Sequence, residues 1–195
     1  MAITKEQIIL ASIAVLNRGG IERLTTRELA GELNIKSASL YWHFKDKREL
    51  YGEIAEYMVR GMELPEKTDN ARQFLTEAMR SFRRLLLTVR DSPAIFENSP
   101  PNTPERIEVI KKISRKLFEL GVKYENLPTV SNMLNNYVLS FAADEARFKS
   151  APPGAFNVIN KEVFPETPLL LRDQTDFDGQ FLYGLRILFS GIENA

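Results

Sequence analysis

Residues 24–50 read LTTRELAGELNIKSASLYWHFKDKREL, and this stretch decides the fold of the N-terminal part of the chain. Thr25-Thr26-Arg27-Glu28 matches a capping box and predicts the start of a short helix. Asn34-Ile35-Lys36 predicts a tight turn, and a second short helix is expected over Ser37–His43. Two short helices joined by a tight turn, the second of them polar and basic, are typical of a helix-turn-helix.

The second short helix has the properties of a segment that enters the major groove of DNA. Ser37, Ala38 and Ser39 are small, which allows a close approach, and Tyr41 shares a helix face with Ser37. The stretch from Asn34 to Arg48 holds four basic residues and one acid, although the formal net charge of the whole chain is zero. A local basic patch of this kind attracts phosphates even on a neutral protein.

The single tryptophan and the single histidine of the chain are neighbours, at positions 42 and 43. We predict that Trp42 wedges the second helix against its neighbours, and that His43 and Lys47 face a phosphate. Less specific interpretations remain open. A histidine at a helix end often only caps carbonyls, a basic cluster is often a solvated face, and a Tyr-Trp pair often belongs to a core.

Composition excludes several kinds of site. Without cysteine the chain has no disulfide and no thiolate, and with one histidine it cannot build a multi-histidine zinc site. We therefore predict no metal and no cofactor. No apolar run is long enough to span a bilayer, and the first residues, MAITKEQIIL, do not resemble a secretory signal. We expect a cytoplasmic protein that does not contact a membrane.

The rest of the chain is predicted to be helical as well, so the fold class is all-α. Apolar residues recur at helical spacing, no strand alternation is visible, and Pro93 is expected to break a helix. An irregular region is predicted between Ala151 and Asp173. The helices expected outside the helix-turn-helix span about 4–18, 46–63, 71–89, 104–121, 128–148 and 175–192.

The stretch quoted above resembles the DNA-binding domain of TetR-family transcriptional repressors. The resemblance lies in the LTTR entry, the LYWH core of the second helix and the KDKREL opening of the next helix. SFRRLLLTVRD and QFLYGLRILFSGIE are similar to the family's ligand-domain helix and last dimerisation helix. The family implies a three-helix DNA-binding domain over residues 1–46 and a helical effector-binding and dimerisation domain over 47–195. It also implies a homodimer that binds a palindromic double-stranded operator and is released by a small-molecule effector.

The resemblance assigns roles to individual residues of the DNA-binding domain. Ser37 and Ala38 stand where the tetracycline-responsive members have Gln and Pro, and a serine cannot read adenine bidentately as a glutamine can. A different operator sequence is therefore expected. Base contacts are implied for Ser37, Ala38 and Tyr41, and phosphate contacts for Thr26, Arg27, Ser39, His43 and Lys47; Lys36 completes the predicted DNA-binding set.

The predicted effector pocket departs from the tetracycline-responsive members. Phe96 replaces the metal-binding histidine, Glu63 and Ala78 replace drug-binding polar residues, and one metal-associated acid persists as Asp144. A magnesium–tetracycline effector is therefore not expected, and a small hydrophobic or aromatic effector is. The alternative for each pocket candidate is ordinary bundle core. The candidates are Phe82, Phe96, Met133, Asn136, Tyr137 and Phe141.

Two other classes of function compete with this interpretation. An enzyme is disfavoured because no nucleophile–base pair or Gly-rich phosphate loop occurs, and the adjacent acids Asp144 and Glu145 diverge on a helix. The second alternative is a DNA-binding protein whose larger domain only dimerises. A void of roughly several hundred Å³ lined by the aromatic candidates would favour an effector, whereas a filled core would favour dimerisation alone.

The last two predicted helices are expected to form the dimer interface. Helices 128–148 and 175–192 would pack with their symmetry mates as a four-helix bundle. An apolar stripe along the last helix is predicted to face the partner, with Leu185 near its centre. The stripe consists of Phe177, Phe181, Leu185, Leu188 and Ile192.

Overall fold

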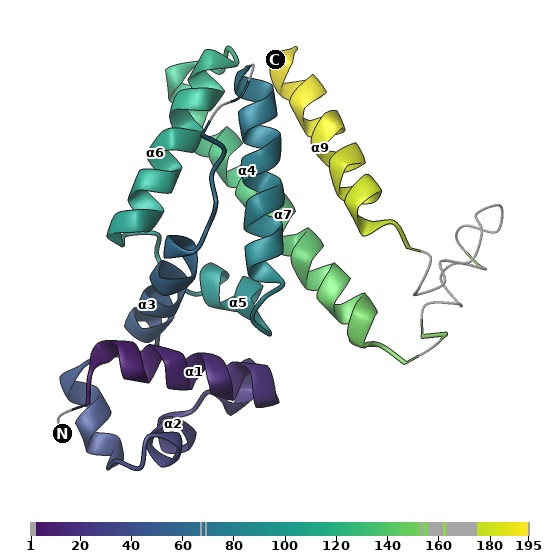
Figure 1. Ribbon diagram of the computed structural model, residues 1–195. Coiled ribbons are helices and arrows are strands. Elements are labelled where there is room, and N and C mark those ends of the chain that lie inside the picture. The colour runs from purple at the N-terminus through teal and green to yellow at the C-terminus, as the bar shows by residue number, and fades with distance from the viewer. Residues whose placement is uncertain are drawn as a thin grey trace.

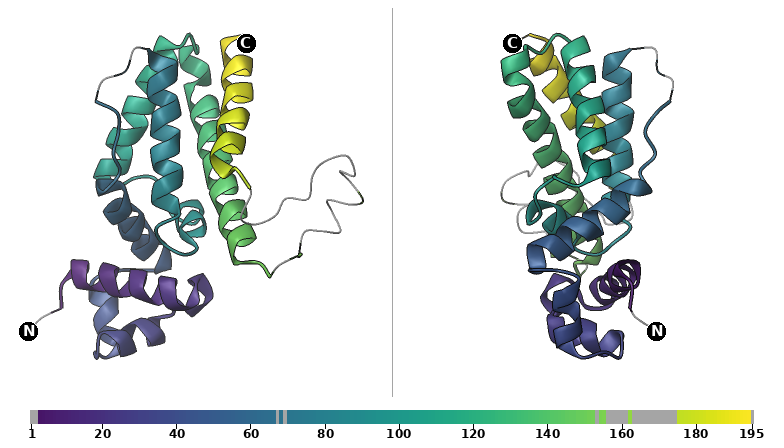
Figure 2. Two further views of the ribbon diagram at one scale, coloured as in Figure 1. Left: turned by 45° about the vertical axis from the view of Figure 1, so that its right-hand side comes forward. Right: turned by 90° about the vertical axis from the view of Figure 1, so that its left-hand side faces the viewer.

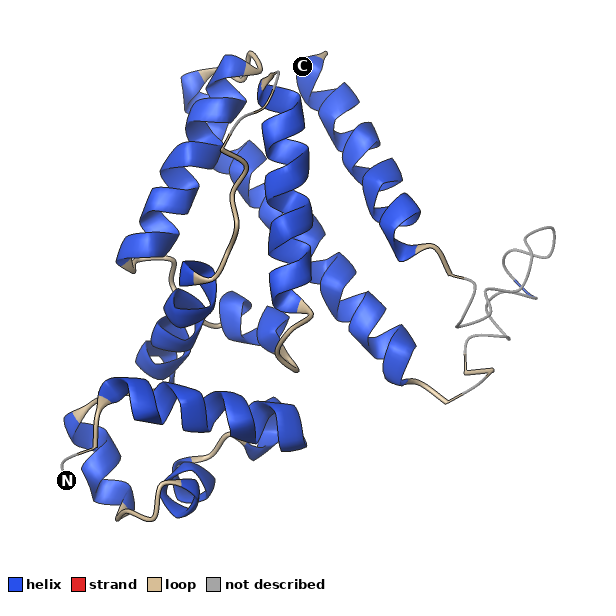
Figure 3. Cartoon of the chain, viewed as in Figure 1, coloured by secondary structure: helices blue, strands red, loops and turns tan. Residues whose placement is uncertain are grey.

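The computed structural model of the protein describes residues 3–66, 68, 70–152, 154–155, 162 and 175–194. Every regular element among these residues is helical, which confirms the all-α prediction (Figure 3). Most of the irregular region predicted over 151–173 lies outside the described residues. The elements are α1 (Lys5–Gly19), η1 (Ile21–Arg23), α2 (Thr26–Glu32), η2 (Ser37–Trp42), α3 (Lys47–Arg60), α4 (Ala71–Leu86), α5 (Ser92–Glu97), α6 (Pro104–Glu119), η3 (Tyr124–Asn126), α7 (Leu127–Ser150) and α9 (Phe177–Glu193).

Short polar side chains start the helices of the N-terminal domain. Thr4 and Gln7 form a full capping box at α1. Thr25 accepts a hydrogen bond from the backbone N–H of Glu28 at α2, and Asp46 does the same for Glu49 at α3. The domain boundary predicted at residue 46 therefore coincides with the N-cap of α3, and it stays a prediction.

The second helix of the helix-turn-helix is a 3₁₀ helix, η2, and its place is fixed by apolar anchors. Leu40 within η2 and Phe44 just after it are buried, as are Leu24 and Leu29 on the preceding segment. These side chains hold η2 against α2 at the bottom of the molecule, and α1 crosses above them (Figure 1). The polar side of η2 is thereby left on the surface.

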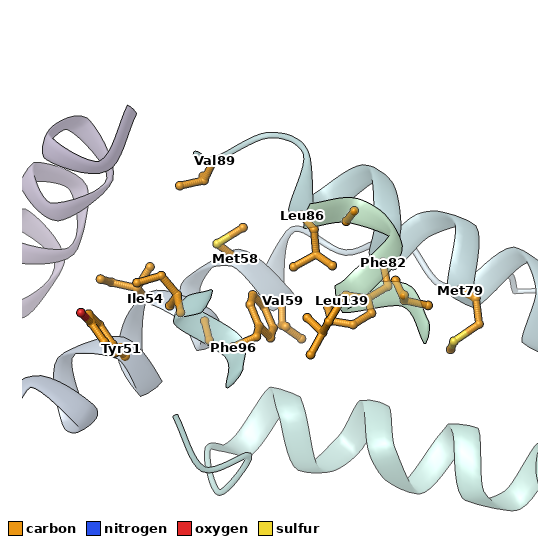
Figure 4. Close-up of a cluster of buried hydrophobic side chains, with 14 of the residues drawn as sticks. Tyr51, Ile54, Met58, Val59, Met79, Phe82, Leu86, Val89, Phe96 and Leu139 are labelled. Atoms are coloured by element: carbon orange, nitrogen blue, oxygen red, sulfur yellow. The ribbon is translucent and has the colours of Figure 1, made fainter. Parts of the chain in front are cut away.

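Helix α3 leaves the small domain and enters the larger one. Its buried residues Ile54, Met58 and Val59 belong to one apolar cluster with Phe82 of α4 and Phe96 of α5 (Figure 4). The helix ends at Arg60, a few residues before the predicted end at Glu63. A rotation or shift of α3 would therefore change the packing of the larger domain's core and move the helix-turn-helix at the same time.

Helix α5 was not expected from the sequence. Pro93 lies in the first turn of α5, where a missing N–H costs nothing, so this proline starts a helix instead of only ending one. Asp91 precedes it in a left-handed conformation, and its carboxylate accepts a hydrogen bond from the N–H of Ile21 at 2.8 Å. The backbone N–H of Arg90 likewise donates to the Asn17 side chain. These two hydrogen bonds form a second connection between the domains, in addition to α3.

The larger domain is a bundle in which α4 packs against α6, α7 and α9 (Figure 2). A buried ion pair crosses the bundle: the Arg83 Nε on α4 donates to the Glu145 carboxylate on α7 at 2.7 Å. Arg83 also donates to Asp178 in the first turn of α9. None of the described helices combines the length and the hydropathy needed to cross a membrane.

Candidate DNA interface and effector cavity

Three of the predicted DNA-binding residues lie together on the small domain. A groove lined by Thr26 of α2, Tyr41 of η2 and Lys47 of α3 brings together side chains from three elements. Tyr41 is 65% exposed, as expected of a ring that faces a ligand instead of the core. Of the other predicted residues, Arg27, Lys36, Ser37 and Ala38 are exposed, and Ser39 and His43 are half-buried.

The prediction for Trp42 is wrong. Its side chain is 90% exposed, so it does not wedge η2 against the neighbouring helices. The packing is supplied by Leu40 and Phe44, one on each side of the Tyr-Trp pair in sequence. An exposed tryptophan leaves a large apolar surface in contact with water. Exposed apolar surface of this kind often marks a site that binds another molecule. Its position next to Tyr41 extends that surface.

The basic residues of the small domain fall into two groups. Lys5 pairs with Glu53, Arg18 with Glu32, and Arg23 with Glu28. The others make no ion pair with any part of the chain that the structure describes, and all of them are exposed. Cations without a carboxylate partner are free to neutralise phosphates. This second group consists of Arg27, Lys36, Lys45, Lys47 and Arg48.

The larger domain contains a cavity between α3, α4, α5, α6 and α7. Its inner part is narrow, about 110 Å³, and reaches Val59, Met79 and Phe82. Its outer part is about 710 Å³ and extends along α7 past Asn136. The two parts form one site because they share the lining residues Phe96, Pro101, Arg106, Ile110, Ser131 and Asn135. A volume of this order is that of a small-molecule site.

Half of the predicted pocket residues line this cavity. Phe82 and Phe96 meet edge to face at 5.2 Å in the inner part, and Asn136 lines the outer part. Met133 instead lies exposed on α7. Tyr137 and Phe141 are likewise not on the cavity wall.

Tyr137 and Phe141 belong to the contact between α7 and α9. Both rings pack on Phe181 of α9, at 5.4 and 5.1 Å between centroids. The Tyr137 hydroxyl donates to the Phe181 carbonyl at 2.8 Å, and it lies so near Gly184 that a Cβ there would clash with it. The sequence could not reveal this, because a helix with apolar residues on several faces does not show which face meets the cavity.

Three further positions bear on the tetracycline comparison. Ala78 is buried in α4, whereas Glu63 is exposed beyond the end of α3, and neither lines the cavity. Asp144 lies exposed on α7 and pairs with Arg147 at 2.8 Å. Within the described part of the chain, no cluster of three or more carboxylate or imidazole side chains could hold a metal ion.

Glu56 connects α3 to the wall of the cavity. Its buried carboxylate accepts hydrogen bonds from the backbone N–H groups of Glu105 and Arg106, at the N-terminus of α6. Burial raises the pKa of Glu56, but the hydrogen bonds at this N-terminus and the charge of Arg60 lower it by more. The carboxylate therefore stays ionised and ties the helix that carries the DNA-binding domain to α6.

Two family models match successive parts of the chain. The family model described as "Bacterial regulatory proteins, tetR family" matches residues 8–54, and "Tetracyclin repressor-like, C-terminal domain" matches residues 64–195. The chain belongs to the TetR family. Its regulatory function is accordingly that of a DNA-binding repressor that responds to a ligand, and the relatives it matches are transcriptional regulators.

Individual relatives cover nearly the whole TetR-family chain. The tetracycline repressor protein class A from transposon 1721 of Escherichia coli is 30% identical over 95% of this chain and 88% of its own. The Streptomyces coelicolor TetR family protein ActR, in complex with (S)-DNPA, superimposes with a TM-score of 0.78 at 25% identity, covering 98% of each chain. TetR from Acinetobacter baumannii AYE gives 0.71 at 27% identity, over 98% of this chain and 97% of that one.

Proposed function

We propose that this protein is a cytoplasmic homodimeric repressor that binds a palindromic operator and is released by a small, largely apolar or aromatic effector. The observation that carries the DNA-binding part is the group of five unpaired cations around the exposed Tyr41 and Trp42. The cavity of the larger domain carries the effector part. Two copies of η2, one from each protomer, would read half-sites about one helical turn apart.

Within the interface, base contacts are assigned to Ser37, Ala38 and Tyr41, which are exposed on η2. Trp42 is added to this group because it is next to Tyr41 and even more exposed. The remaining predicted residues lie on α2, on η2 and on the segments next to η2 in sequence, and they would hold the phosphate backbone, which fixes the register of the protein on the duplex. These are Thr26, Arg27, Lys36, Ser39, His43 and Lys47.

The test of the DNA-binding part compares a base-reading residue with a phosphate-binding one. Tyr41→Ala is expected to weaken binding to the selected operator by about 1–3 kcal/mol, because a contact to a base edge is lost. Lys47→Ala should weaken binding to all sequences similarly and reduce the slope of log K against log salt by about one. Fluorescence anisotropy with labelled duplexes at several salt concentrations measures both.

Arg23→Ala is the matched control, because Arg23 is exposed on the same domain but is paired with Glu28. It should leave the salt slope unchanged. The assignment fails if Lys47→Ala and Arg23→Ala give the same slope as the wild type, or if Tyr41→Ala binds the operator as tightly as the unaltered protein.

The effector part of the proposal rests on the cavity and its connection to α3. The outer part, of about 710 Å³, is large enough for a small molecule, so the cavity favours an effector over that alternative. Val59 of α3 lines the inner part, and Glu56 of the same helix holds the N-terminus of α6. A ligand that prefers one arrangement of these helices would displace η2 by biasing that arrangement.

Magnesium–tetracycline is expected to bind weakly or not at all. Magnesium needs near-octahedral oxygen ligands, and at the cavity wall Phe96 offers only a ring that excludes water. Titration of tetracycline with and without magnesium, followed by intrinsic fluorescence of Trp42 or by drug fluorescence, measures this. Submicromolar binding that EDTA reverses would contradict the expectation.

The dimer is assigned to α7 and α9, but not to the stripe predicted from the sequence. Phe181 and Leu185 of that stripe are buried within the chain, so Leu185 packs on its own bundle in place of a partner. Tyr183 and Ile187 of α9 are instead more than half exposed. We assign the partner-facing surface to these two residues and to Met133 on α7, which is 47% exposed.

A further inference from the structure

Arg106 is a buried charged side chain in the mainly apolar wall of the effector cavity. It lies in the first turn of α6, is 7% exposed, and lines both the inner and the outer part of the cavity. Its guanidinium lies over the Phe96 ring, 5.2 Å from the centroid. A buried arginine is rare without a specific partner, so its surroundings define what it can bind.

The hydrogen bonds of Arg106 go to neutral groups only. Nη1 donates to the Ser99 hydroxyl and the Pro100 carbonyl, both at 3.0 Å, and Nη2 donates to the Ser99 carbonyl at 3.3 Å. No carboxylate of the described chain lies within ion-pair distance. Arg83 is equally buried but has Glu145 and Asp178 as partners, so the bundle does supply carboxylates where a guanidinium is buried for structure alone.

The carboxylate that could neutralise Arg106 is already engaged elsewhere. Glu56 attracts the guanidinium through space, but its oxygens accept hydrogen bonds from the α6 backbone. Burial lowers the pKa of Arg106, and the charge of Glu56 only partly opposes this. Glu97 lines the outer cavity but is exposed at its edge. Because an arginine keeps its proton even when it is buried, the guanidinium is charged, largely desolvated and without a direct counter-ion.

A second polar group beside the cavity lacks a hydrogen-bond partner, as Arg106 lacks a counter-ion. Ser131 on α7 lines both parts of the cavity, and its hydroxyl oxygen is buried beside the cavity and makes no hydrogen bond to any residue that the structure describes. Asn135 lies one helical turn further along the same face and lines both parts as well. Buried hydroxyls are nearly always satisfied, so an unsatisfied one in a cavity wall points to a ligand.

We propose that the effector is an organic anion, an aromatic or flat carboxylate or phenolate, whose charged oxygens bind Arg106. This deepens the proposed function and rests on it. The anion would supply the missing counter-ion through a charge-assisted hydrogen bond, while Ser131 and Asn135 bind a further polar group of the same molecule. The apolar side chains of the cavity wall would pack against its rings. Competition for the guanidinium would weaken its hold on Ser99 and Pro100, next to the α6 N-terminus that Glu56 of α3 binds.

The test uses two dyes that differ in one charged group: anilinonaphthalene sulfonate, an anion, and N-phenylnaphthylamine, its neutral analogue. The wild type is expected to bind the sulfonate about tenfold or more tightly than the neutral dye, because only the sulfonate meets the guanidinium. Arg106→Met should lose that preference and keep its affinity for the neutral dye within about twofold. Arg106→Lys, which keeps the charge, should retain part of the preference and covers the case in which Arg106→Met does not fold.

Two controls locate the dyes. Arg115→Met alters an exposed arginine of the same helix outside the cavity and should change neither affinity. Ile110→Trp fills the shared part of the cavity and should weaken both dyes. Circular dichroism of each variant confirms the fold.

Release of operator DNA by each dye separates the two levels of the proposal. If the neutral dye binds the cavity as tightly as the sulfonate and releases DNA equally well, the anion inference is overturned and the effector function stands. If the affinities of both dyes are unchanged in Ile110→Trp, neither occupies the cavity, and the inference falls together with the cavity as effector site. A sulfonate preference that disappears in Arg106→Met but persists in Arg115→Met supports it.

Discussion

Replacing Ile187 by glutamate is expected to split the proposed dimer. Ile187 is 56% exposed in the single chain, so glutamate can be accommodated there without disturbing the bundle core. In a two-fold symmetric dimer the same patch faces itself, and each protomer contributes one copy of the change. Burying an unpaired carboxylate costs about 3–5 kcal/mol, which raises the dissociation constant by about a hundredfold or more.

Sedimentation velocity across a range of protein concentrations measures this change. Operator binding should weaken in parallel, because one protomer contacts only one half-site. Ile107→Glu is the matched control: Ile107 is an exposed isoleucine on α6 and should leave the dimer intact. A wild type that sediments as a monomer at micromolar concentration, or an Ile187→Glu variant that remains a dimer, would contradict the assignment of the interface to α9.

Local sequence signals predicted the elements of this fold well. Thr25 and Asp46 cap α2 and α3 as expected, because a cap depends on residues only three positions apart. The resemblance of the quoted stretch to TetR-family repressors was confirmed by family models over both domains. Helix α5 was missed because Pro93 was read as a break, although a proline in a first turn also starts a helix.

The choice between helix faces could not be predicted. Trp42 was assigned to packing and is exposed, whereas Leu185 was assigned to the dimer and is buried. In both segments apolar residues occur on more than one face, so periodicity does not decide which one meets the core. The prediction that Tyr137 lines the cavity was wrong for the same reason. Its ring packs on Phe181, which is 44 residues away in sequence, and periodicity within α7 does not reveal that partner.

The polar groups of the cavity also escaped the sequence analysis. Arg106 follows Pro104 and Glu105 in the first turn of α6, and its side chain packs against Phe96 and the Ser99–Pro100 segment, which precede that helix. Ser131 and Asn135 are spaced one turn apart, which places them on one face but does not say what they face. Only the packing of α6 on α7 brings the three together.

The second large effect is expected at Arg83, whose partners Glu145 and Asp178 lie far from it in sequence on α7 and α9. Arg83→Met should destabilise the protein by about 3–5 kcal/mol, because the buried Glu145 carboxylate loses its buried partner and keeps only Lys149 at the surface. For a chain of this length, that corresponds to a drop in Tm of about 6–20 °C. Thermal unfolding at one fixed protein concentration measures it.

Two comparisons distinguish the buried charge pair from lost packing. The double variant Arg83→Met/Glu145→Met removes both charges and should recover most of the lost stability. Arg147→Met breaks the exposed pair with Asp144 on α7 and should cost no more than about 1 kcal/mol. If the double variant is less stable than Arg83→Met, the loss in Arg83→Met does not come from leaving Glu145 unpaired, and the contacts of Arg83 with the Phe141 and Phe181 rings account for it instead.

The pH dependence of stability gives an independent measure of the Arg83 network. The hydrogen bond from Arg83 is the main cause of a lowered pKa of the Asp178 carboxyl in the folded protein. Stabilisation by this group is therefore fully present above the ordinary carboxyl pKa and is lost as the pH falls through the lowered folded value. In Arg83→Met the pKa of Asp178 returns toward its ordinary value, so this acid-dependent part of the unfolding free energy should disappear. Urea unfolding of the wild type and of Arg83→Met, from neutral pH down to below the ordinary carboxyl pKa, compares the two slopes, and parallel slopes would show that Arg83 does not hold Asp178 in solution.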